Sequence, residues 1–127
     1  RFSAEHEDII NATGTMRRAA VAGDRDATVE ALNQLTTLLR PHVLSEERSL
    51  FAELRADPEF AEHIEQLCSE HRSIADGLAQ VAAGDLGSAV AVETLLRQHI
   101  DKEENGLFPA AAIALDGPAW AQVAARA

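Results

Sequence analysis

An all-α fold, an antiparallel up-down four-helix bundle, is predicted by three features of the sequence. Four long segments rich in Ala, Leu, Glu and Arg are separated by short breaks, and no strand pattern competes with them. Each segment carries an apolar stripe at spacings of three and four residues. Short links between long helices favour antiparallel neighbours. The length suits a single domain, residues 1–127.

The breaks in the sequence place the ends of the predicted helices. We expect helices over about 3–22, 25–56, 58–83 and 88–115, with a short C-terminal helix over about 118–126. Asp57-Pro58-Glu59 favours a helix start, with Asp as the cap, Pro at the first position and an acid in the first turn. Pro41 predicts a kink inside the second helix, and Pro109 predicts an irregularity near the end of the fourth.

The composition excludes several classes of function. The formal net charge of −10 argues against binding to nucleic acid or to an anionic membrane. No tyrosine is present, so a tyrosine radical is excluded. No apolar stretch is long enough to span a membrane. The first residues, RFSAEHED, do not resemble a signal peptide, and the single cysteine, Cys68, forms no intrachain disulfide. We therefore expect a cytoplasmic location.

An internal repeat links the second and fourth helices. LLRPHVLSEERSLF at residues 38–51 and LLRQHIDKEENGLF at 95–108 are identical at eight of fourteen positions. A fainter repeat relates Glu5-His6-x-x-Ile9 to Glu70-His71-x-x-Ile74. The chain therefore consists of two related hairpins, and each supplies one His and one His-x-x-x-Glu.

The repeated histidines and glutamates lie on the apolar stripes, where a buried polar group is costly unless it is paired or bound to a metal. Residues four apart share one helix face, so His42 with Glu46, and His99 with Glu103, point into one volume. A lone His of this kind is usually a satisfied core residue, and a lone His-x-x-x-Glu usually a surface pair. Two copies in phase favour metal binding. The six expected donors are His6, His42, Glu46, His71, His99 and Glu103.

Six donors exceed the four that one structural zinc needs, and they suit two metals bridged by carboxylates. Imidazole and carboxylate together suit iron, with manganese or zinc as substitutes.

The order His6, His42-x-x-x-Glu46, His71, His99-x-x-x-Glu103 resembles the hemerythrin-like, or HHE cation-binding, family. The resemblance covers essentially the whole chain. It implies a four-helix bundle with a non-haem di-iron centre, oxo- or hydroxo-bridged. It also implies that His6 and His42 bind one iron, that His71 and His99 bind the other, and that Glu46 and Glu103 bridge them.

The sequence departs from the oxygen carriers of that family at two positions. Leu67 stands where carriers have a further His, one turn before His71. The second bridging acid of the carriers is usually an Asp separated from its His by four residues, whereas here it is Glu103, separated from His99 by three. A missing ligand leaves an open position on the metal, which favours reactive chemistry over reversible oxygen carriage.

Several nearby residues have predicted roles outside the ligand set. His63 lies about 80° around the helix from His71. We therefore expect His63 to flank the site or lie at the surface, and the alternative is that it is a seventh ligand. We expect Glu47 and Glu104 to be outer acids, which lie behind the ligands or at the surface and do not bind the metal. We expect Glu5 and Glu70 to orient imidazoles of neighbouring helices. Cys68 is expected to be a small buried residue or a redox group, and Thr13 a packing residue or a hydroxyl near the pocket.

Three functions fit this pattern. The first is a redox di-iron enzyme, oxidase- or peroxidase-like, that binds and reacts with dioxygen, peroxide or nitric oxide. The second is a non-catalytic module that binds oxygen or iron and reports it to a partner. The third, a purely structural bundle, does not explain the repeat. The missing ligand at Leu67 favours the first.

Overall fold

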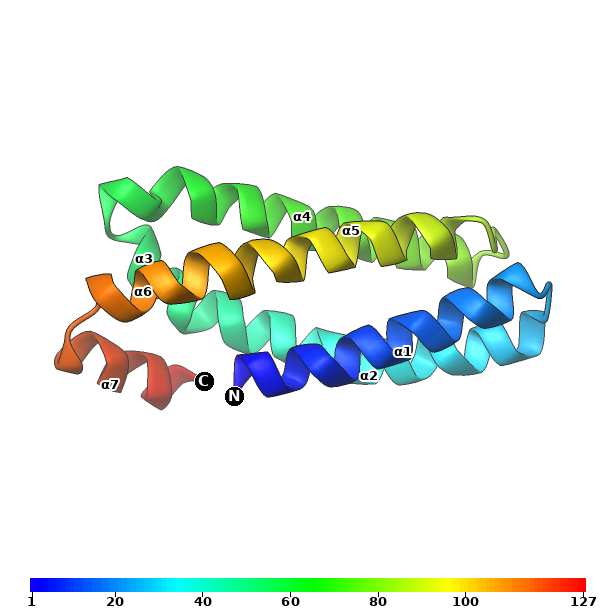
Figure 1. Ribbon diagram of the computed structural model, residues 1–127, viewed down its shortest axis with the longest axis horizontal. Coiled ribbons are helices and arrows are strands. Elements are labelled where there is room, and N and C mark those ends of the chain that lie inside the picture. The colour runs from blue at the N-terminus through cyan, green and yellow to red at the C-terminus, as the bar shows by residue number, and fades with distance from the viewer.

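The computed structural model describes residues 1–127, and all of its regular structure is helical. The long helices are α1 (Phe2–Val21), α2 (Arg25–Arg48), α4 (Pro58–Ala82) and α5 (Ser88–Lys102). They lie side by side along the long axis of the molecule (Figure 1). The shorter elements are α3 (Leu50–Arg55), a π-helical turn (Glu103–Leu107), α6 (Phe108–Ala114) and α7 (Gly117–Arg126).

Aspartate caps and glycine turns set the ends of the helices. The Asp57 carboxylate accepts a hydrogen bond from the Glu59 amide at 2.9 Å, which confirms the predicted helix start at Pro58. Asp24 caps α2 in the same way, accepting from the Ala27 amide at 3.0 Å. The two long hairpins turn at glycines with positive φ, Gly23 (72°) and Gly84 (107°), which other residues rarely adopt.

The predicted helix over 25–56 is in fact two helices, and the break between them lies at Ser49. α2 continues through Pro41 to Arg48, whereas Ser49 has φ −110° and ψ −90°. The Ser49 hydroxyl donates to the Ser45 carbonyl at 2.6 Å, a side-chain bond that competes with regular helix bonding. The prediction of one continuous helix over 25–56 was therefore wrong, and the kink at Pro41 stays a prediction.

The predicted helix over 88–115 is interrupted by the π-helical turn from Glu103 to Leu107. Pro109 lies in the first turn of α6 and has no N–H to donate to the preceding turn, so the regular bonding must change before it. The expected irregularity near Pro109 is confirmed. The wider turn begins at Glu103, one of the six predicted donors, and π-helical turns are frequent at functional sites.

Two apolar clusters fill the interior, and a polar layer separates them. On α4, Leu67 belongs to one cluster and Ile74 to the other, with His71 between them. On α5, Leu96 lies on one side of His99, and in the π-helical turn that follows α5, Leu107 lies on the other side of Glu103. The polar layer is therefore held between packed side chains on both sides.

None of the helices is both long and apolar enough to cross a membrane.

Candidate metal centre

Six buried polar side chains form the layer between the two apolar clusters. The carboxylates of Glu46 and Glu103 are 0% exposed, and the four imidazoles are between 3% and 8% exposed. Burying that many ionisable groups without compensation is strongly unfavourable. The six are the predicted donors His6, His42, Glu46, His71, His99 and Glu103.

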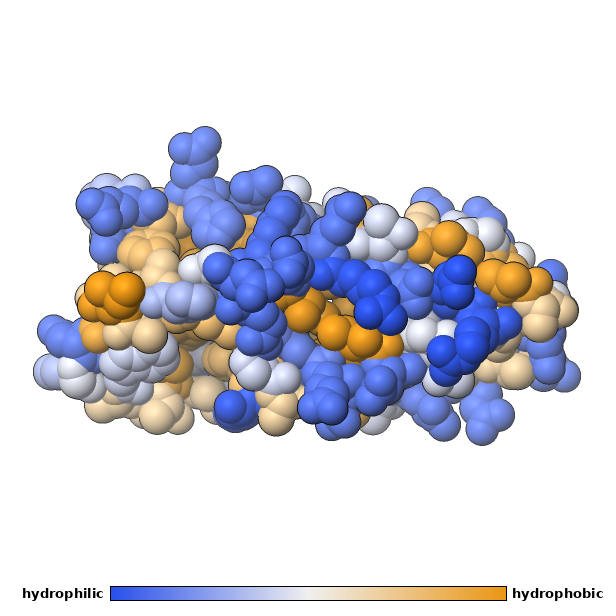
Figure 2. All heavy atoms as spheres, viewed as in Figure 1, coloured by the Kyte–Doolittle hydropathy of each residue, from blue (hydrophilic) through white to orange (hydrophobic).

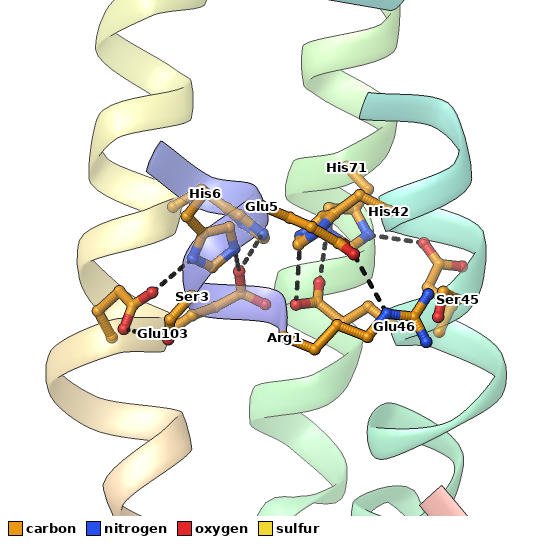
Figure 3. A network of polar contacts seen from close by, with 12 residues as sticks. Arg1, Ser3, Glu5, His6, His42, Ser45, Glu46, His71 and Glu103 are labelled. Carbon is orange, nitrogen blue, oxygen red and sulfur yellow. Dashed lines mark hydrogen bonds and ion pairs between the residues drawn. The ribbon is translucent and has the colours of Figure 1, made fainter. Parts of the chain in front are cut away.

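The donors fall into two sets that share both carboxylates. One set is His6, His42, Glu46 and Glu103, and the other is Glu46, His71, His99 and Glu103. Within each set, the donor atoms all lie within 4.8 Å of one another. Figure 3 shows the Glu46 and Glu103 carboxylates pointing toward the imidazoles from neighbouring helices. Each set could hold one cation, and both carboxylates belong to both sets.

The inward-facing atoms of this layer lack hydrogen-bond partners. His6 Nε2 is 3.2 Å from Glu103 Oε1, and His71 Nε2 is 3.3 Å from Glu46 Oε1, but most of these inner atoms make no contact with hydrogen-bond geometry. Buried polar atoms are nearly always hydrogen-bonded, so orphaned ones need an explanation. A cation between the lone pairs would satisfy them. The orphaned atoms are His6 Nε2, His99 Nε2 and both oxygens of Glu46 and Glu103.

Each imidazole is held from behind by an outer carboxylate. A carboxylate accepts the Nδ1–H of the ring, so the inward-facing Nε2 keeps its lone pair. Such a bond fixes the ring orientation and makes Nε2 a stronger donor to a metal. The four pairs are His6 with Glu104 (2.8 Å), His42 with Glu5 (2.7 Å), His71 with Glu47 (2.7 Å) and His99 with Glu70 (2.8 Å).

These outer contacts follow the internal repeat. Glu5 and Glu70 each bond the second histidine of their own hairpin, as expected for acids that orient a neighbouring helix. Glu47 and Glu104 instead bond the first histidine of the other hairpin. Their prediction as outer acids is confirmed. What the sequence did not predict is that these two acids connect the hairpins to each other through the site.

A scan against protein-family models matches residues 1–111 to the hemerythrin HHE cation-binding domain. The chain belongs to this family. No curated protein and no solved structure gives a significant match. The family resemblance expected from the histidine and glutamate pattern is therefore confirmed. Membership gives the hemerythrin-like chain a cation-binding role, and the two donor sets are where its structure gathers suitable ligands.

The two inner carboxylates of the hemerythrin-like site have different proton affinities. Burial raises the pKa of the Glu46 carboxyl well above its usual value, and the charge of Glu103 raises it further. Burial acts in the same direction on Glu103, but the imidazoles of His6 and His99, whose Nε2 atoms lie 3.2 and 3.4 Å from Glu103 Oε1, outweigh it and hold its pKa well below the usual value. Without a cation, Glu46 is therefore the carboxyl of the pair that binds a proton more tightly. Protons compete with a metal for these carboxylates, so metal affinity should fall in acid.

The other predicted candidates lie outside the two donor sets. His63 is half-buried and belongs to neither set. The Thr13 hydroxyl donates to the Ile9 carbonyl at 2.7 Å, which supports a packing role. Cys68 is buried in the second apolar cluster, with its Sγ 3.4 Å from the Arg55 guanidinium. Leu67 is fully buried in the same cluster, one turn before His71.

An apolar pocket of about 420 Å³ leads to the imidazoles. Its exposed lining residues come from α2 and α4, so it opens between these helices. Figure 2 shows the other face, where polar side chains dominate and a small apolar patch lies where α1 and α5 meet. Sequence reasoning missed this pocket. Its four imidazole neighbours are His6, His42, His71 and His99.

Proposed function

We propose that the chain is a non-haem di-iron protein that binds and reacts with dioxygen, peroxide or nitric oxide. His6 and His42 hold one iron, His71 and His99 hold the other, and both glutamates bridge. The observation that carries the proposal is the pair of buried donor sets that share Glu46 and Glu103. We infer that the arrangement around them is an antiparallel up-down four-helix bundle.

The donor chemistry supports iron. Each set offers two imidazoles and two carboxylates, a mixture that suits iron and also accepts manganese or zinc. Four protein donors leave positions open on an ion that prefers six, and open positions admit exogenous ligands. When bound, the irons supply the electrons and the open positions for small oxidants.

The residues around the site prepare it for such ligands. The outer carboxylates hold the rings with Nε2 facing inward, so the centre needs little rearrangement on metal binding. The apolar pocket beside His42 and His71 gives small uncharged molecules an apolar path to the site. Leu67 cannot ligate, so an iron held by His71 and His99 would keep a position open to an exogenous ligand.

The test is anaerobic loading with Fe²⁺, followed by stopped-flow absorbance with dioxygen, peroxide and nitric oxide in separate experiments. Rapid, repeated consumption of one of them supports a redox enzyme. A stable adduct that reverses on removal of the gas supports the second candidate, a module that binds oxygen or iron and reports it. An iron-loaded protein that reacts with none of the three contradicts the proposal.

A further inference from the structure

We propose that the pocket between α2 and α4 binds an amphiphilic carboxylate, an organic molecule with an extended apolar body and one carboxylate head. The pocket ends at the imidazoles, so the role of this ligand as a co-substrate or modulator of the centre rests on the proposed function. Its binding does not require the metals, because the apolar walls and the cation described below belong to the protein alone.

The internal repeat relates two gaps in the bundle, one between α1 and α5 and one between α2 and α4. The gap between α1 and α5 is closed. Between α1 and α5, Arg17 Nε lies 3.2 Å from Glu93 Oε1, and this ion pair joins the two helices. Ile10 adds a bulky side chain packed against the first apolar cluster. The Arg17–Glu93 ion pair therefore spans the α1–α5 gap, and Ile10 adds a large side chain on α1.

The equivalent gap between α2 and α4 lacks all three closing groups. When the two halves of the repeat are aligned, Ala75 occupies the position of Ile10, Ala82 that of Arg17 and Thr36 that of Glu93. All three replacements line the pocket. Their short side chains neither bridge the helices nor fill the space between them. The pocket is therefore a specific departure from the symmetry of the repeat.

The shape of the pocket suits an extended apolar body. Along α2 its lining runs from Leu32 to Leu44, a span of about 18 Å at the rise of an α-helix. Opposite, it runs along α4 from Ala82 to His71. The volume of about 420 Å³ falls in the range of small-molecule sites, which are mostly apolar with a few polar groups. A diatomic gas would leave nearly all of this space empty.

A cation without a partner lies at the histidine end of the pocket. Arg40 lines the pocket two residues before His42. Its counterpart in the repeat, Arg97, lies 3.7 Å from Glu93, whereas Thr36 gives Arg40 no such carboxylate. A free guanidinium beside an apolar pocket, in a chain of net charge −10, favours a ligand that brings its own carboxylate.

The direct experiment is calorimetric titration of decanoate into the metal-free protein and into the iron-loaded protein, with decylammonium as the opposite-charge control. We expect one saturable decanoate site in both forms and no decylammonium binding. Arg40→Gln should weaken decanoate binding about tenfold or more, because it removes a charge-assisted contact. Arg72→Gln is the matched control, since Arg72 is exposed on α4, outside the pocket, with the same charge change.

A second variant tests the apolar walls. Ala79 is an exposed pocket residue on α4, so Ala79→Phe should fill the pocket and abolish decanoate binding without loss of iron. Ala112→Phe, at an exposed position on α6, is the control. Methyl NMR of Leu39 and Ile74 gives an independent signal, which decanoate should shift in the parent protein.

Several results overturn the inference. These are no decanoate binding, equal binding by the Arg40 and Arg72 variants, or unchanged binding by Ala79→Phe. A dimer in sedimentation that Ala79→Phe dissociates, without decanoate binding, would make the gap an interface between copies. If the chain binds decanoate but loads no iron, the pocket proposal is supported and the proposed di-iron function is contradicted.

Discussion

His71 donates its Nδ1–H to Glu47, 2.7 Å away, and thereby connects α4 to α2. The next residue on α2 toward the N-terminus, Glu46, lies 3.3 Å from Nε2 of the same ring. One imidazole is thus held from outside by one acid of α2 and faces the other acid inside the site. The same relation connects His6 to Glu104 and Glu103. The two hairpins are therefore joined by the groups that form the site.

The first prediction concerns the outer acid. Glu47→Gln should lower metal affinity by about 10–100-fold, because the ring of His71 loses the carboxylate that orients it and strengthens Nε2 as a donor. Competition with a chelator of known affinity measures the change. Glu62→Gln, at an exposed position of α4, makes the same charge change away from the site. Equal affinities for the two variants would show that the Glu47 contact does not tune the metal.

The second prediction concerns pH and the metal-free protein. The pKa of Glu46 is raised in the folded state, so its contribution to stability is present below the ordinary value of 4.5 and is lost as pH rises through the raised pKa. Glu46→Gln cannot titrate and should be more stable than the parent at neutral pH by about 1–3 kcal/mol. Urea unfolding with a chelator, at several pH values, measures this.

Glu103→Gln is the contrasting variant, because the charge of Glu103 is stabilised by His6 and His99. It should be less stable than the parent at neutral pH. If both substitutions change the free energy of unfolding in the same direction, the two carboxylates do not differ as described.

The third prediction separates bridging ligands from terminal ones. Glu46→Ala and Glu103→Ala should each remove both metals, because each carboxylate belongs to both donor sets. His6→Ala should mainly weaken one metal, because His6 belongs to one set. Metal analysis after loading and desalting gives the occupancies. Full occupancy of both metals in either glutamate variant would refute bridging.

The fourth prediction concerns Leu67, which lies one turn before His71 and is fully buried. Leu67→His should fill the open position of the iron held by His71 and His99. The variant should then bind oxygen more reversibly and consume peroxide more slowly, as measured by stopped flow. Leu67→Met preserves apolar character and approximate volume and serves as the control. Parent-like kinetics in Leu67→His would mean that this position does not face the iron.

The sequence predicted the meeting of the six donors because it depends on local rules. The spacing from His42 to Glu46 places both on one helix face, and the repeat places His99 and Glu103 in the same relation. The sequence predicted an irregularity near Pro109 but not its π-helical form at Glu103, and it did not predict the break at Ser49. Both depend on side-chain bonding and packing at particular turns. The apolar pocket was not predicted, because it lies between α2 and α4, which belong to different hairpins, and the sequence does not show how the hairpins pack together.

Differences between the two halves of the repeat nevertheless indicate where the pocket lies. Comparing Thr36 with Glu93, and Ala82 with Arg17, shows where the two halves differ in bulk and charge. Those differences acquire meaning only when the structure shows that Arg17 and Glu93 pair across α1 and α5.

The central claim is a pair of metal ions held between the helices, and the most direct measurement is the iron content per chain. The protein is loaded anaerobically with excess Fe²⁺, desalted, and analysed for iron and for protein by independent methods. The two donor sets that share Glu46 and Glu103 predict a reproducible limit of about two iron ions per chain. A limit of one ion, or none, would contradict the account.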